Sequence, residues 1–163
     1  MNQLILWDIF NKIKEIPDKS IDLIITDPPY KIVAGGAWWC FWVEKEKYHL
    51  EVSKNDMLNC GIDNSILNEF MRVMRKPNIY LWCNKNQLRQ YLDFFEDAKC
   101  SVDVLVWCKT NPIPTCSNKY LSDIEYIVFA RAKGVKVYWS YSTKHKYYVS
   151  QLNSYPTYNM QTA

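Results

Sequence analysis

The feature that most constrains the fold is a short apolar segment that ends abruptly at two prolines. Residues 21–26 are mostly apolar and rich in β-branched side chains, as expected for a parallel strand that is buried on both faces. Asp27, Pro28 and Pro29 follow directly, and proline cannot donate a hydrogen bond to a sheet ladder. The sequence therefore predicts a buried parallel strand with Asp27 directly after its carboxyl end.

The residues before this strand predict the rest of a βαβ unit. Residues 4–7 form a short apolar run that is typical of a strand. Apolar side chains then recur at the spacing of an amphipathic helix: Ile9, Phe10, Ile13 and Ile16. A turn at residues 17–20 leads into the strand. A strand, a helix and a second strand in this order indicate a Rossmann-like arrangement.

Helices and strands also alternate in the rest of the chain. We expect helices at residues 64–75, where Asn64 or Ser65 is the candidate N-cap, and 86–98, and strands at residues 78–83, 102–107 and 124–130. Residues 135–139 are expected to pair with the last strand across Gly134, and the tail from Ser150 is polar. The sequence thus predicts one α/β domain over residues 1–163, a mixed sheet with flanking helices, interrupted by an irregular insert at residues 31–61.

Charge and aromatic content leave the partner open. The net charge is only +3, but no Asp or Glu follows Glu125. Five basic side chains do follow it: Arg131, Lys133, Lys136, Lys144 and Lys146. An acid-free basic surface suits a polyanion such as DNA, although solvated lysines would read the same way. The 7 Trp, 12 Tyr and 6 Phe either fill a large core or provide stacking surfaces for bases.

Several classes of protein are not indicated. No pair among the six cysteines has the close spacing of a zinc site, so we predict no metal site. No apolar run reaches the roughly 18 residues of a membrane helix, and the first residues do not read as a signal peptide. We expect reduced thiols and a cytoplasmic protein without a membrane partner.

The segment from Asp27 to Tyr30 carries the clearest chemical signal. A carboxylate and a fixed Pro28 carbonyl provide two acceptors at the carboxyl end of a strand, where α/β sheets bind ligands. Two acceptors suit an exocyclic amine with two N–H groups and would localise its lone pair for attack on a sulfonium methyl group. The Tyr30 ring would stack on the base, which contributes about 1–3 kcal/mol. The alternative is a strand end, a Pro-Pro turn and a buried tyrosine.

Residues 20–30 closely resemble the signature of N6-adenine and N4-cytosine DNA methyltransferases of the β class, in which the catalytic motif comes first. The resemblance implies a Rossmann-like S-adenosylmethionine-dependent methyltransferase fold, S-adenosyl-L-methionine as cofactor and double-stranded DNA as partner. It also implies that Asp27, Pro28, Pro29 and Tyr30 are catalytic. Adenine is the expected target because cytosine enzymes more often carry Ser at the position of Asp27.

The resemblance extends to other candidate site residues. Asp8 matches an acidic residue that contacts the adenosine of the cofactor, although Trp7 replaces the usual Gly and Asp8 could instead cap a helix. Residues 155–157 resemble a His-Pro-Thr segment, which makes Thr157 a further cofactor-binding candidate together with Asp27. Residues 107–112 resemble the family's strand and loop near the target base, and residues 125–131 resemble the strand that follows. Candidates for DNA contact are Lys31, Trp38, Trp39, Lys109, Asn111, Lys144 and Lys146; the tryptophans could equally form a lid or a dimer contact.

One expected motif is missing from the sequence. The 4 glycines form no G-x-G turn after a strand, which would allow close approach to the cofactor. In the β class that turn follows the Pro-Thr segment, so we expect a domain truncated before it. A homodimer or a second chain would then complete the sheet, and we expect the chain alone to bind the cofactor weakly and to methylate DNA poorly or not at all. Three alternative functions remain open: a catalytically inactive remnant or nucleic-acid-binding subunit, an N4-cytosine enzyme, and a protein or RNA amine methyltransferase, which usually carries Asn at the position of Asp27. A restriction endonuclease partner also remains open.

Overall fold

A computed structural model describes residues 9–31, 61–112, 120–138 and 140–152. Several predictions lie outside the described residues: the strand at residues 4–7, almost all of the insert, and the candidate residues Asp8, Trp38, Trp39 and Thr157.

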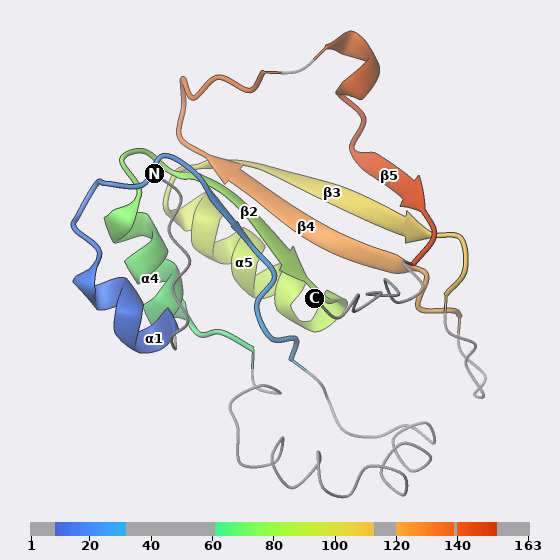
Figure 1. Cartoon of the computed structure of the whole chain (residues 1–163), viewed down its shortest axis with the longest axis horizontal. Coiled ribbons are helices and arrows are strands. Elements are labelled where there is room, and N and C mark those ends of the chain that lie inside the picture. The colour runs from blue at the N-terminus through green and yellow to red at the C-terminus, as the bar shows by residue number, and fades with distance from the viewer. Residues whose placement is uncertain (1–8, 32–60, 113–119, 139, 153–163) are drawn as a thin grey trace, which may run out of the picture.

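The described residues form one five-stranded sheet with helices. Along the chain the elements are α1 (Ile9–Lys12), the 3-10 helix η1 (Ile13–Glu15), β1 (Ile24–Thr26), α4 (Asn64–Val73), β2 (Asn78–Cys83), α5 (Lys85–Asp97), β3 (Ser101–Lys109), β4 (Ile124–Arg131), the 3-10 helix η3 (Tyr141–Thr143) and β5 (Tyr147–Ser150). The strand order is β1-β2-β4-β3-β5. Figure 1 shows the arrowheads of β2, β3 and β5 pointing toward one end of the sheet, whereas β4 runs the opposite way.

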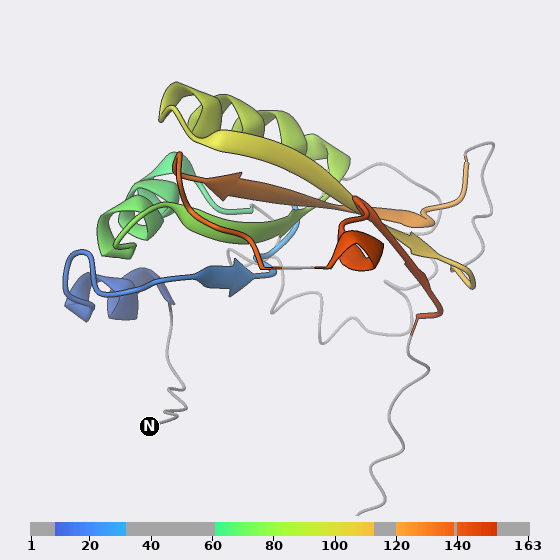
Figure 2. The ribbon, with the colours of Figure 1, turned by 90° about the horizontal axis from the view of Figure 1, so that it is seen from above.

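Helix α5 covers one face of this sheet (Figure 2). Alternate residues of β2 are buried toward the helices, as the period of a strand requires. The predicted inward face of α5 is confirmed, because Tyr91 and Phe95 are fully buried and Leu88 and Leu92 pack against the core. The predicted apolar face of α4 is buried as well: Ile66, Leu67, Phe70, Val73 and Met74.

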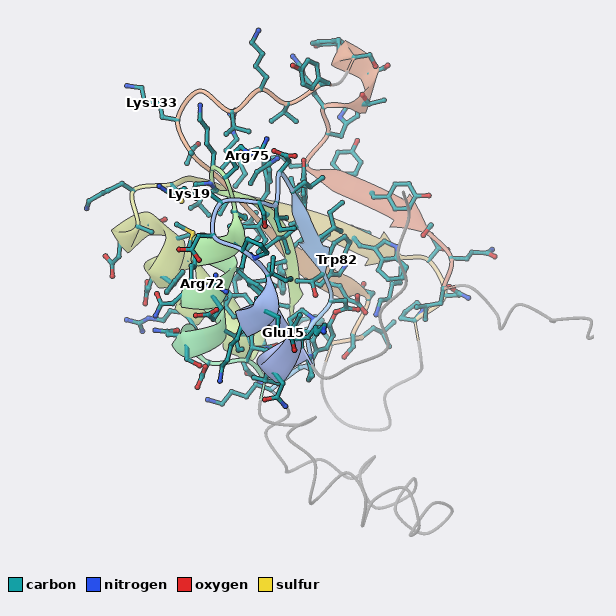
Figure 3. All side chains as sticks on the ribbon, turned by 60° about the vertical axis from the view of Figure 1, so that its left-hand side comes forward. Glu15, Lys19, Arg72, Arg75, Trp82 and Lys133 are labelled. Atoms are coloured by element: carbon teal, nitrogen blue, oxygen red, sulfur yellow. The ribbon has the colours of Figure 1, made fainter. Side chains whose placement is uncertain are left out.

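The N-cap of helix α4 lies one residue before Asn64, the first of the two predicted caps. Asp63 is the N-cap, and its carboxylate accepts hydrogen bonds from the backbone N–H groups of Ser65 at 2.9 Å and Ile66 at 3.3 Å. At the other end Arg72 ties α4 to the segment before β1 (Figure 3). Its guanidinium donates to the carbonyls of Ile13 and Ile16, each at 2.9 Å, and pairs with the carboxylates of Asp18 and Glu69.

The strand that ends at Asp27 is parallel, as predicted, but it is not buried on both faces. It spans only Ile24–Thr26 and pairs with β2 alone in the described sheet. Side chains of this segment are accordingly exposed, to 43% at Leu23 just before the strand and 62% at Ile25 within it. Strand β1 is therefore one of the two outermost strands of the described sheet.

The predicted pairing of residues 135–139 with the strand before them is wrong over the described residues 135–138, which form no strand. Both sides of β4 are already occupied, by β2 and by β3, so no ladder position remains. Arg131 instead donates a 2.7 Å hydrogen bond to the Val135 carbonyl. The fifth strand, β5, lies further along the chain, where the sequence predicted no strand. No helix within the described segments is long and apolar enough to cross a membrane.

Candidate active site

The carboxyl ends of the parallel strands meet at one end of the sheet, which we call the carboxyl edge, and the candidate site lies there. Asp27 follows β1, Asn84 follows β2, and Lys109 is the last residue of β3. Because β4 is antiparallel, its first residues lie at this same edge, and the register places Glu125 opposite Trp107. Ligands bind beyond the carboxyl ends of strands in such sheets, so this edge is the expected place for a site.

Tyr30 is held at this edge by a carboxylate from β4. Its hydroxyl donates a 3.2 Å hydrogen bond to Oε2 of Glu125, and the other Glu125 oxygen pairs with the Lys109 ammonium. The Lys109 and Glu125 side chains are only 12% and 20% exposed. Burial raises the pKa of Tyr30, and the charges of Glu125 and Asp27 raise it further. Tyr30 is therefore a neutral, anchored phenol.

Asp27 is accessible at the edge of the sheet. Partial desolvation raises the pKa of its carboxyl group; interaction with the Tyr30 hydroxyl lowers the pKa and the Glu125 charge raises it. Two neighbouring carboxylates make this edge rich in hydrogen-bond acceptors, and the Lys109 ammonium balances the charge of one of them, Glu125. Such a site favours a ligand that brings N–H donors or a positive charge.

The loop after Asp27 is fixed by the first turn of α5. Gln87, which is only 1% exposed, donates 3.0 Å hydrogen bonds from Nε2 to the Pro29 carbonyl and to the Tyr91 hydroxyl. Asn84 and Asn86 both donate to the Lys31 carbonyl, at 2.9 Å and 3.2 Å. Three amide side chains thus set the path of the backbone on either side of Tyr30.

The Pro28 carbonyl, the second predicted acceptor, behaves differently from that of Pro29. Pro28 is buried, but its carbonyl accepts no hydrogen bond from the residues that the structure describes. Within that part of the chain, this oxygen therefore keeps its capacity to accept a hydrogen bond.

Gly61 allows the chain to pass close to Gln87. Its φ is +71°, and a Cβ atom placed there would lie 2.8 Å from Nε2 of Gln87. We expect Gly61→Ala to lower the free energy of unfolding by about 2–4 kcal/mol, since it adds overpacking to the strain of a positive φ. Gly134 is the matched control, because its φ is +87° but nothing lies within 4 Å of the added Cβ. Gly134→Ala should lower the free energy of unfolding by only about 1 kcal/mol. Urea titration of both variants measures these changes, and equal changes would contradict the close contact between Gly61 and Gln87.

The other described candidates for DNA contact lie in different settings. The Asn111 amide holds the chain after β5, accepting from the Leu152 N–H at 2.5 Å and donating to its carbonyl at 3.4 Å. Lys146 pairs with Asp103. Lys31 and Lys144 are exposed. Of the predicted residues, the structure therefore brings Lys109 together with Tyr30 through Glu125 and places Lys31 directly after the motif.

Sequence reasoning missed three residues of this site: Asn84, Gln87 and Glu125. Asn84 and Gln87 form a capping box at the start of α5, and a cap residue followed three positions later by Gln is a recognisable pattern. Glu125 had no local signal, because its position beside Tyr30 depends on strand order and register. Within the described segments, no cluster of three or more His, Cys, Asp or Glu side chains could hold a metal ion.

The raised pKa of Asp27 predicts a stability that depends on pH. Since the folded pKa exceeds the unfolded one, the ionised carboxylate destabilises the folded state at neutral pH, and this effect vanishes below about pH 4. Asp27→Asn should therefore unfold at higher urea than the wild type at pH 7, with no difference in acid. Asp63 supplies the opposite case, because hydrogen bonds from Ser65 and Ile66 lower its pKa. Asp63→Asn should therefore unfold at lower urea than the wild type at pH 7. If both variants change the stability in the same direction at pH 7, the opposite pKa shifts of Asp27 and Asp63 are refuted.

Comparisons with known proteins support the fold. No protein-family model matches the sequence, and no curated protein matches it. The solved structure of M1.HpyAVI in complex with SAM is 24% identical over 83% of this chain and 57% of that chain, with a TM-score of 0.50. A structure of M1.HpyAVI is 21% identical over 88% of this chain and 64% of that chain, with a TM-score of 0.53. The chain thus spans less than two thirds of either, and its described residues share the α/β fold of these structures, a mixed sheet with flanking helices.

Proposed function

We propose that this chain acts in the transfer of a methyl group from S-adenosyl-L-methionine to the exocyclic N6 amine of adenine in double-stranded DNA. The observation that carries the proposal is the Asp27–Tyr30 segment at the carboxyl edge of the sheet, with an accessible carboxylate, an anchored tyrosine and a fixed backbone. The fold of the M1.HpyAVI structures, one of them a complex with SAM, supports the same reaction class.

In this mechanism the protein acts by positioning. The Asp27 carboxylate and the Pro28 carbonyl accept the two N–H groups of the amine, and the Tyr30 ring contacts the face of a base flipped out of the duplex. S-adenosyl-L-methionine would supply the methyl group, whose S–C bond breaks as the new N–C bond forms, so that S-adenosylhomocysteine is the second product. Asp27 and Pro28 would hold the amine with its lone pair directed at that methyl carbon, and the proton that the methylated nitrogen loses would pass to solvent beside the accessible Asp27. The same Asp27 carboxylate would stabilise the positive charge that develops on the nitrogen.

The negative charge of the described site residues suits the positive charge of the proposed methyl donor. S-adenosylmethionine supplies an electrophilic methyl group on a positively charged sulfur. Partial desolvation, and to a lesser degree the charge of Glu125, raises the pKa of Asp27, and a cation beside the Asp27 carboxylate favours its ionised form. We propose that Asp27, with Asp8 and Thr157, contributes to cofactor binding.

DNA is proposed to lie across the same side of the molecule as the site. The proposed contacts are the candidates named from the sequence: Lys31, Trp38, Trp39, Lys109, Asn111, Lys144 and Lys146, with residues 31–61 as a target-recognition insert. Support comes from the region around η3 and β5, where Lys144 is exposed beside exposed aromatic side chains. Those side chains are Tyr138, Tyr141, Tyr147 and Tyr148. Lysine and tyrosine together favour phosphate contact and base stacking.

A specific observation favours a second candidate function. The sequence has no G-x-G turn after a strand, so the chain could instead bind nucleic acid as a non-catalytic subunit. Incubating the chain with unmethylated duplex DNA and labelled S-adenosylmethionine, followed by nucleoside analysis, separates the two. We expect labelled N6-methyladenine; N4-methylcytosine alone would show the cytosine reaction. Salt-dependent DNA binding without any labelled nucleoside would overturn the proposal in favour of the non-catalytic function.

A further inference from the structure

The Glu125 carboxylate occupies a position that the methyl-transfer chemistry described above does not use. One of its oxygens accepts from the Tyr30 hydroxyl and the other pairs with Lys109. Both contacts lie at the edge where Asp27 ends β1, and both partners of the ion pair are largely buried. Because each Glu125 oxygen already contacts a protein group, we infer that this carboxylate has a structural role in the site and does not bind a ligand directly.

We propose that Glu125 is a positioning residue that anchors the Tyr30 ring beside Asp27, with Lys109 holding Glu125 in place. This inference rests on the proposed function for its effect on methyl transfer, whereas the anchoring itself does not depend on that function.

The anchor is preorganised because Glu125 and Lys109 both lie in paired strands of the sheet. Glu125 lies in β4 opposite Trp107 of β3, and the backbone N–H of Lys109 donates a 2.7 Å hydrogen bond to the Asp123 carbonyl. The Lys109 ammonium also lies 5.3 Å from the centre of the Trp107 ring, which restricts its side chain further. The ion pair therefore reaches Tyr30 from a fixed strand pair, as a preorganised site requires.

The anchor also determines which part of Tyr30 can contact a ligand. Its hydroxyl donates to Glu125 and also interacts with Asp27, so the ring faces are the part that remains for a planar ligand. Loss of the hydroxyl and loss of Glu125 should both release the ring from β4, and in Glu125→Ala the hydroxyl keeps only its interaction with Asp27. The effects of Tyr30→Phe and Glu125→Ala are expected to be non-additive, because the two side chains act as a unit.

Fluorine NMR of the full chain labelled with 3-fluorotyrosine tests the anchoring without any need for activity. The Tyr30 resonance is identified by its loss in Tyr30→Phe. We expect it to move toward the position of exposed tyrosines in Glu125→Ala and in Lys109→Met, and to stay near its wild-type position in Glu125→Gln, whose amide oxygen still accepts from the hydroxyl. Asp103→Asn, which breaks the Lys146 ion pair on the same strand β3, should leave it unchanged. An unchanged Tyr30 resonance in folded Glu125→Ala would overturn the anchoring.

Methyl-transfer kinetics test the consequence. We expect Glu125→Ala to lower kcat/KM by about 10–100-fold, in line with the effect of a small misplacement of a reacting group, and the double variant with Tyr30→Phe to fall no further. Glu125→Gln should recover most of the loss. Additive losses would contradict action through Tyr30. A wild-type chain without transferase activity would contradict the proposed function instead, and the fluorine spectra would still decide the anchoring.

Discussion

Replacing Asp27 by alanine is expected to abolish methyl transfer to DNA, with a loss of at least about 10²–10³-fold in kcat/KM. The change removes one of the two acceptors for the amine and the charge that stabilises the nitrogen as it becomes positive. The fold should survive, because Asp27 is accessible and lies outside β1. The measurement is the initial rate of labelled methyl transfer, with urea unfolding to confirm that the variant is folded.

Asp93 provides a matched control for the loss of an accessible aspartate. It lies on α5 and makes only an exposed ion pair with Arg89 at 3.5 Å, which is worth a few tenths of a kcal/mol. Asp93→Ala should transfer methyl groups at the wild-type rate. An Asp27→Ala variant that keeps its rate, or an equal loss in both variants, would refute the assigned role of Asp27.

Replacing Gln87 by alanine is expected to lower the free energy of unfolding by about 2–4 kcal/mol, the largest stability effect that we expect at a polar residue of the site. The change leaves the Tyr91 hydroxyl buried without its partner and releases the Pro29 carbonyl, and an unpaired buried polar group costs about 1–3 kcal/mol. The truncation also leaves a cavity beneath the loop. Because the loop carries Tyr30, methyl transfer should weaken as well.

Gln90, on the same helix, is the control for this change. Its amide donates to the Ile62 carbonyl at 3.2 Å and to Asn64 at 3.0 Å in a more open environment, where water can replace either bond. Gln90→Ala should therefore cost no more than about 1 kcal/mol. Similar unfolding free energies for the two variants, measured in urea, would show that Gln87 does not hold the loop.

Much of the fold could be predicted from local patterns. Strand β2 coincides with its predicted range, and α5 lies within one residue of its prediction, because alternation and helical periodicity are properties of neighbouring residues. The edge position of β1 could not be predicted, since an apolar strand reads the same whether one or two strands flank it. The placement of β4 between β2 and β3, and of β5 beside β3, depends on pairings between distant segments, which local patterns do not encode.

The candidate site divides in the same way. Asp27 and Tyr30 could be predicted because two prolines end a strand at a recognisable motif. The contribution of Gln87 depends on the packing of α5 beneath that motif, and the capping box alone does not reveal its bond to Pro29. Glu125 meets Tyr30 across 95 residues of sequence, so only the folded sheet brings them together. Lys109 was predicted as a DNA contact, and the structure places its ammonium against Glu125.

The central claim is that the Asp27 edge of the sheet directs methyl groups to an amine of a DNA base. The most direct test is single-molecule sequencing of DNA from a methylation-free host that expresses either the wild-type chain or Asp27→Ala. This measurement detects modified bases throughout the host DNA, whatever the recognition sequence is. We expect modified adenines at one recurring sequence with the wild-type chain and none with Asp27→Ala. The absence of modified bases in both samples, with both proteins folded and expressed, would contradict the central claim.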